Sequence, residues 1–205
     1  MRDSFSAMLC LTCHGPAAGW LCVVCRRSLR SAPDRLLPTG IPVLAAFEHE
    51  GVARRLIHLL KYQGVVAVAG LVAESLAPRL PGLPLVPVPR AWSRRLRYGI
   101  DPALEMARAL SKQNGEPVVR ALASPVHSPR RAGHNRSRRS QPFRSAGEVA
   151  GEVVLVDDVL TTGATLAAAA DAIGASRVQM AVTASAVFGV SNLSPRVTSP
   201  IRGRV

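Results

Sequence analysis

One short segment limits the possible folds of this chain more than any other. Residues 153–156 read Val-Val-Leu-Val, and Asp157, Asp158 and a threonine-rich turn at 161–165 follow them. A continuous apolar run of this length predicts a strand that is buried on both faces, as in the parallel sheets of α/β proteins. Ligands of open α/β sheets bind at the carboxyl ends of the strands. The segment therefore predicts an α/β domain with a polar site where this strand ends.

Strand-like and helix-like stretches alternate through the middle of the chain. Strands are predicted at 43–47, 85–88, 118–122, 153–156 and 178–188, and helices at 52–62, 66–76, 101–113 and 166–173. This alternation favours parallel strands joined by helices. Asp101 followed by Pro102 predicts a helix start, with an N-cap before proline in the first turn. We expect a metal-binding module at 1–38, an α/β domain at 39–190 and a disordered tail at 191–205.

The turn after the two aspartates has the chemistry of a phosphate-binding loop. From Thr161 to Thr165 it offers backbone N–H groups, three hydroxyls and the N-terminus of the next helix, and Gly163 allows close approach of the backbone. Adjacent carboxylates suit hydrogen bonds to two ribose hydroxyls, or a shared metal ion. The segment therefore predicts a site for a ribose phosphate. The alternative is that Asp157 and Asp158 only cap the turn.

All four cysteines belong to one N-terminal arrangement. Two Cys-x-x-Cys pairs, Cys10 with Cys13 and Cys22 with Cys25, are separated by eight residues. Four thiolates presented in this way suit tetrahedral Zn²⁺, and metal binding would supply the folding free energy that so few apolar residues cannot. Two disulfides or two redox pairs are the alternatives, and disulfides are disfavoured because no secretory signal is apparent. We predict a structural zinc site.

The strand and turn at 153–166 resemble the phosphoribosyl pyrophosphate motif of type I phosphoribosyltransferases. Across about residues 8–190 the chain is similar to the ComF family of phosphoribosyltransferase-like proteins. The features that carry this resemblance are the paired Cys-x-x-Cys knuckles, Leu59-Leu60-Lys61-Tyr62-x-Gly64, Val86-Pro87-Val88-Pro89 with Arg94, Arg95 and Arg97, the Gly99-Ile100-Asp101 element and the run from Val153 to Leu166. The resemblance implies a type I phosphoribosyltransferase-like parallel sheet flanked by helices, with a small N-terminal module in which the four cysteines bind zinc.

The resemblance also implies the ligands and the roles of individual residues. Asp157 and Asp158 would be catalytic and hold the ribose hydroxyls of phosphoribosyl pyrophosphate. The rest of the binding segment would be Val159, Leu160, Thr161, Thr162, Gly163, Ala164 and Thr165, and the pyrophosphate side would be Val88, Pro89, Arg90, Arg94 and Arg95. Mg²⁺ and cationic groups would stabilise the departing pyrophosphate in an oxocarbenium-like transition state.

Two departures from the family pattern fall on the pyrophosphate and base side. Residues 98–102 read Tyr-Gly-Ile-Asp-Pro where members have Arg-Gly-Phe-Asn-Gln, and Arg136-x-x-Arg139 stands before Phe143 in place of an Arg-x-x-Asn pattern. They leave two functions open. One is a phosphoribosyltransferase that releases pyrophosphate. The other is a non-catalytic accessory protein of competence and DNA uptake, which binds single-stranded DNA or a DNA helicase.

The charge of the chain is large and unevenly distributed. The formal net charge is +13, of which residues 90–144 contribute +10, whereas residues 145–190 sum to −4. This balance favours an anionic partner such as phosphate or nucleic acid. For the arginine-rich stretch 130–144 we predict a loop that is a flap over pyrophosphate, a contact with single-stranded DNA or simply a solvated loop. We expect a cytoplasmic protein with no membrane span, because no apolar run reaches the roughly 18 residues that a span needs.

Overall fold

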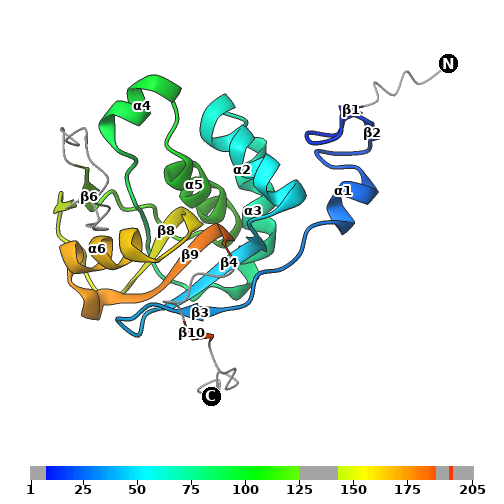
Figure 1. The fold of residues 1–205 in the computed structure, drawn as a ribbon. Coiled ribbons are helices and arrows are strands. Elements are labelled where there is room, and N and C mark those ends of the chain that lie inside the picture. The colour runs from blue at the N-terminus through cyan, green and yellow to red at the C-terminus, as the bar shows by residue number, and fades with distance from the viewer. Residues whose placement is uncertain (1–7, 125–142, 188–193, 196–205) are drawn as a thin grey trace, which may run out of the picture.

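A mixed, mostly parallel sheet of six strands forms the centre of the computed structural model, which describes residues 8–124, 143–187 and 194–195. In order across the sheet the strands are β10 (Ser194–Pro195), β3 (Arg35–Leu36), β4 (Pro42–Glu48), β9 (Val178–Ala186), β8 (Val153–Leu160) and β5 (Leu85–Pro87). β4, β9, β8 and β5 are parallel, and β3 and β10 add an antiparallel edge. The predicted α/β fold is therefore confirmed (Figure 1).

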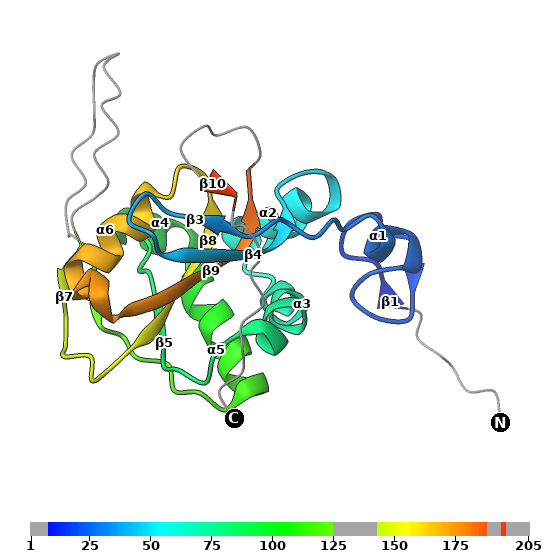
Figure 2. The ribbon, with the colours of Figure 1, turned by 90° about the horizontal axis from the view of Figure 1, so that it is seen from below.

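Helices cover both faces of this sheet. One face packs against α2 (Gly51–Gln63), α3 (Ala67–Leu76) and α5 (Pro102–Asn114), and the other against α6 (Ala164–Ile173), as Figures 1 and 2 show. The short elements of the domain are η1 (Ala77–Arg79), α4 (Trp92–Tyr98), β6 (Leu122–Ala123), β7 (Arg144–Ser145) and η2 (Ala175–Arg177). The sheet thus has a separate apolar core on each face.

The position of β8 in the sheet explains why its first four residues are all apolar and do not alternate with polar residues. Val154 and Val156 belong to the core beneath α2, α3 and α5, whereas Val153 and Leu155 belong to the core beneath α6. All four side chains are fully buried. The structure confirms the predicted strand and extends it to Leu160, because pairing with β9 continues to the end of β8. Both aspartates therefore lie within the strand rather than in the turn.

The N-terminal cysteine module lies beside α2, to one side of the sheet (Figures 1 and 2). It contains β1 (Met8–Leu9), β2 (Pro16–Ala17) and α1 (Val23–Arg27). Buried Leu21 packs into the core beneath α2 and α3. An ion pair of 3.6 Å joins Arg26 to Glu74 of α3, but both side chains are more than half exposed, so the pair contributes little stability.

The prediction of a strand at 118–122 is wrong. Val118 makes a single bridge to Leu85 of β5, and the chain next pairs at β6. β5 is only three residues long and ends at Pro87, which has no N–H to donate. So short an edge cannot align a further strand along its length.

The predicted tail and the predicted loop fall largely outside the described residues. Within 191–205, Ser194 and Pro195 pair with the edge strand β3, so a disordered tail is wrong for these two residues. An edge strand has free backbone groups that can pair in this way. The loop prediction at 130–144 lies outside the described residues except for its last two positions. No helix in the described parts of the chain is long and apolar enough to cross a membrane.

Candidate functional site

The carboxyl ends of the four parallel strands surround a pocket of about 500 Å³. Its lining residues are His49, Lys61, Val88, Pro89, Arg90, Ala91, Arg94, Asp101, Pro102, Ala103, Phe143, Asp157, Asp158, Val159, Thr161, Thr165 and Val187. His49 follows β4, the aspartates lie in the second half of β8, Val88 follows β5 and Val187 follows β9. Parallel strands bring residues that are distant in sequence to one edge of the sheet, which is why this pocket forms here.

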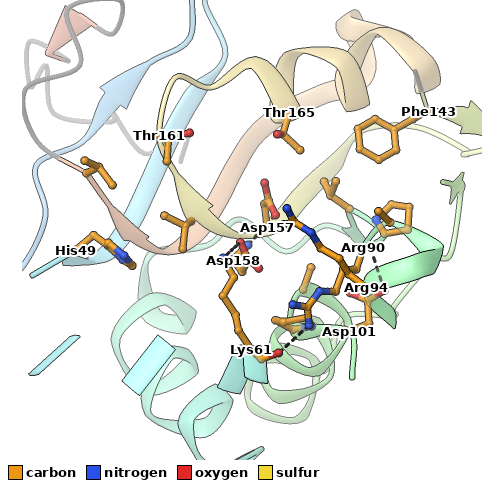
Figure 3. Close-up of a pocket in the computed structure, with 17 residues that line it drawn as sticks. His49, Lys61, Arg90, Arg94, Asp101, Phe143, Asp157, Asp158, Thr161 and Thr165 are labelled. Carbon is orange, nitrogen blue, oxygen red and sulfur yellow. Dashed lines mark hydrogen bonds and ion pairs between the residues drawn. The ribbon is translucent and has the colours of Figure 1, made fainter. Parts of the chain in front are cut away.

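The two aspartates lie in the centre of the pocket (Figure 3). The Asp157 carboxylate accepts the backbone N–H of Asp158 at 2.8 Å. Burial, together with the neighbouring Asp158 carboxylate, raises the pKa of Asp157 to about 7. Among the described residues, neither carboxylate caps α6, whose N-cap is Gly163. The alternative that the aspartates only cap the turn is therefore not supported.

Lys61 is the cation paired with this acidic centre. Its Nζ lies 2.9 Å from Asp158 Oδ1, and each side chain is only about one-fifth exposed. Lys61 stands in the last turn of α2, and Gly64 caps the helix in the left-handed conformation, with φ of 69°. The helix thus ends with its last basic residue directed at β8 (Figure 3).

Arg90 is held in the wall of the pocket by several contacts. Its guanidinium donates to the Lys61 carbonyl at 2.7 Å and to the Ile100 carbonyl at 3.4 Å. It also stacks over Tyr98, 4.8 Å from the ring centroid, and lies 5.6 Å from the centroid of Tyr62. Arg90 therefore ties the end of α2 to the junction between α4 and α5.

Asp101 strengthens the same junction. It is the N-cap of α5 with Pro102 next to it, as predicted, but its carboxylate accepts the backbone N–H of Arg90 at 3.3 Å. Burial raises the pKa of Asp101, and the hydrogen bond from Arg90 opposes that rise. The loop after β5 is thereby fixed by both its backbone and its side chain.

His49 lines the pocket as an uncharged group. Its Nδ1 lies 2.7 Å from the hydroxyl of Ser185, a fully buried residue of β9. Burial lowers the pKa of His49, and the positive charge of Lys61 lowers it further. His49 thus adds to the lining an imidazole whose charged form is disfavoured, whereas Arg94 adds a cation.

The threonine-rich turn reaches the pocket with two of its side chains, Thr161 and Thr165. Gly163 adopts φ of 75° immediately before α6 begins at Ala164. The hydroxyl of Thr162 lies 3.4 Å from the Ala164 nitrogen. The positive end of the α6 dipole therefore borders the same pocket as the two carboxylates.

The four cysteine sulfurs form a compact cluster apart from this pocket. Their Sγ atoms all lie within 4.8 Å of one another, with 3.7 Å between those of Cys13 and Cys22. A tetrahedral zinc site with Zn–S bonds of about 2.3 Å needs sulfurs separated by roughly 3.8 Å. All four residues are free cysteines and could hold a metal ion.

Protonation of the two buried cysteines is strongly perturbed. Burial raises the pKa of Cys10, but hydrogen bonds from Thr12 and from backbone amides outweigh it and lower that pKa to about 5. The Thr12 hydrogen bond lowers the pKa of Cys25, whereas burial and the other three cysteines raise it, to about 12 in all. Four thiolates so close together need a cation, which is what a metal site supplies.

The pocket brings together most of the residues predicted for it. Those that line it are Val88, Pro89, Arg90, Arg94, Asp157, Asp158, Val159, Thr161 and Thr165. Leu160 instead packs in the core, and Thr162, Gly163, Ala164 and Arg95 are not among the lining residues. His49 and Lys61 also line the pocket but are not among the site residues predicted from the sequence. His49 follows a predicted strand, so the same strand-end rule could have found it.

The comparisons with known proteins agree with this geometry. Residues 64–203, about two thirds of the chain, match the model of the phosphoribosyl transferase domain. The match includes both aspartates and the threonine turn, and it excludes the cysteine cluster and Lys61. No curated protein matches the chain.

Proposed function

The chain belongs to the phosphoribosyl transferase domain family, and on that premise we propose that it binds phosphoribosyl pyrophosphate with Mg²⁺ and transfers the phosphoribosyl group to an acceptor. The observation that carries the proposal is the acidic pair Asp157–Asp158 at the centre of a pocket, beneath the turn at the start of α6. The cysteine module and the Leu59–Gly64 motif further support a ComF-like member of the family.

Each part of the ligand has a complementary group in the pocket. The turn from Thr161 to Thr165 would hold the 5-phosphate with backbone N–H groups and hydroxyls at the positive end of α6. The ribose hydroxyls would donate to Asp157 and Asp158, which favours their ionised forms. The pyrophosphate would lie toward the cation Arg94.

The reaction is a substitution at C1 of the ribose. The bond from C1 to the pyrophosphate oxygen breaks, a bond from C1 to the acceptor nitrogen forms, and the acceptor loses its proton to solvent. Carboxylates fixed beneath the ribose stabilise the positive charge that develops on the ring, and Arg94 stabilises the negative charge on the leaving group.

The pocket also has the donor set that Mg²⁺ prefers. Carboxylate oxygens and substrate phosphates are the usual ligands of this ion, and Asp157 and Asp158 face the pocket together. Mg²⁺ bound with pyrophosphate would neutralise charge on the leaving group. The raised pKa of Asp157 is consistent with a bound cation. Ionising this carboxyl is costly when no cation is near it, and a neighbouring cation would stabilise the carboxylate.

The cysteine cluster would hold structural Zn²⁺. Its four sulfurs complete a tetrahedral shell and leave no coordination position for a substrate, so we assign it to folding of the module.

Ligand binding is the first test of the proposed function. With phosphoribosyl pyrophosphate at 100 times its dissociation constant and Mg²⁺ present, we expect the free energy of unfolding to rise by about 2.7 kcal/mol. The double variant Asp157→Asn, Asp158→Asn should lose this increase. An equal increase in the variant would contradict the proposal, as would none in the wild type. Pyrophosphate release across a panel of nucleobases then tests transfer.

A further inference from the structure

Lys61 lines the pocket, yet the proposed function gives it no role. We infer that Lys61 is a pyrophosphate-binding residue that changes partner: its ammonium group neutralises Asp158 in the free protein and binds the pyrophosphate arm when ligand enters. This inference rests on the proposed function, and it assigns a ligand-binding role to the last turn of α2.

The ion pair explains why Lys61 would change partner when ligand enters. Asp158 can accept hydrogen bonds from ribose hydroxyls, or bind a cation, only if it shares or gives up the Lys61 ammonium now 2.9 Å away. The Lys61 side chain is only about one-fifth exposed, so water compensates its charge poorly once its carboxylate is taken. The anion entering the same pocket is the nearest replacement partner. A lysine suits this exchange because its charge sits on a flexible stem with three donors.

Arg90 acts differently from the other cations of the pocket. Its guanidinium is already committed to the carbonyls of Lys61 and Ile100 and to the face of Tyr98. Since one of those bonds holds the backbone of Lys61, Arg90 is a positioning residue for it. Pyrophosphate is therefore left to Arg94 and Lys61, the other two cationic side chains in the described lining.

The composition of the chain makes the exchange observable directly. Lys61 and Lys112 are the only lysines among 26 cationic residues. Reductive ¹³C-methylation would label these two side chains and the N-terminal amine, and Lys61→Met and Lys112→Met would assign the signals. Adding inorganic pyrophosphate should move the Lys61 signal and leave that of Lys112, in the last turn of α5, in place. A Lys61 signal that does not respond to saturating pyrophosphate overturns the inference.

Calorimetry then measures the size of the contribution. Lys61→Met should weaken binding of inorganic pyrophosphate by about tenfold or more, the loss typical of one charge-assisted hydrogen bond. Lys61→Arg should recover most of it, and Lys112→Met should match the wild type. Ribose 5-phosphate, which lacks the pyrophosphate arm, should bind Lys61→Met at least as tightly as it binds the wild type, because the variant leaves Asp158 free to accept the ribose hydroxyls. Arg90→Met should also weaken the binding of pyrophosphate but not the binding of ribose 5-phosphate. If Arg90 had a merely structural role, its loss would weaken the binding of both ligands.

The two proposals fail in different ways. Undiminished pyrophosphate binding by Lys61→Met removes the role of Lys61 and leaves the proposed function standing. A wild-type protein that binds neither phosphoribosyl pyrophosphate nor ribose 5-phosphate overturns the proposed function, and the inference with it.

Discussion

The cysteine module and the carboxyl edge of the sheet both gather polar or metal-binding side chains, but apolar packing contributes very differently to the two regions. The pocket is built on β8, whose Val153–Val156 segment is buried in two cores at once. The module instead exposes most of its large apolar side chains: Met8, Leu9, Trp20, Val23 and Val24 are each 43–73% exposed. Packing therefore holds the pocket in place, whereas ligands to a shared ion would hold the module.

Removal of metal should show the largest difference in stability between the cysteine module and the sheet domain. Chelation, or Cys13→Ser, should unfold the module and leave the sheet folded, because a structural zinc site supplies about 10–16 kcal/mol. Limited proteolysis with mass analysis should find new cleavage within residues 8–29, and elemental analysis should find the metal lost. A module that stays resistant to protease without metal would show that packing supports it after all.

A cavity in the core of the sheet domain should have the reverse effect: it should destabilise the sheet and leave the cysteine module unchanged. Leu155→Ala removes a fully buried side chain from the core beneath α6 and should cost about 2–5 kcal/mol in chemical denaturation of the sheet domain. Its metal content should not change. Leu96→Ala, on the exposed face of α4, is the matched control and should cost less than about 0.5 kcal/mol. Equal losses from the two variants would contradict a packed support.

The pH dependence of stability should report the cost of ionising the acidic pair. Because the pKa of Asp157 is raised to about 7, the folded protein binds more protons than the unfolded chain between about pH 4 and pH 7, and stability falls as pH rises through that window. Asp157→Asn should remove this fall and be more stable than the wild type by up to about 4 kcal/mol at pH 8, the cost of ionising a carboxyl whose pKa lies near 7 rather than 3.8. Parallel stability profiles for the two proteins would mean that Asp157 ionises freely.

The turn at the start of α6 should show a smaller, local effect. Gly163 has φ of 75°, so Gly163→Ala should cost about 1–2 kcal/mol of stability, because side chains disfavour this backbone conformation. Gly70→Ala is the control: it lies inside α3, where an added Cβ meets nothing within 4 Å, and should stabilise by up to about 1 kcal/mol. Thermal unfolding of both variants measures the difference, and a Gly163→Ala protein as stable as Gly70→Ala would argue against strain there.

Prediction from sequence worked where local pattern and packing agree. The apolar run at 153–156 predicted a strand buried on both faces, and Asp101-Pro102 predicted a helix start; the structure has both. The strand predicted at 118–122 failed because pairing depends on a neighbour, and β5 is too short to provide one.

The sequence by itself determined which chemistry this protein has: two adjacent carboxylates, a threonine-rich turn and two cysteine pairs. Those groups are contiguous in the chain, so local spacing suffices to recognise them. Only the tertiary structure decided that Lys61 pairs with Asp158 and that the Arg90 guanidinium donates to the Lys61 carbonyl in the wall of the pocket. Both contacts depend on where the end of α2 lies relative to β8 and β5. The arrangement of the parallel strands and their connecting helices sets that position, and no local sequence pattern encodes it.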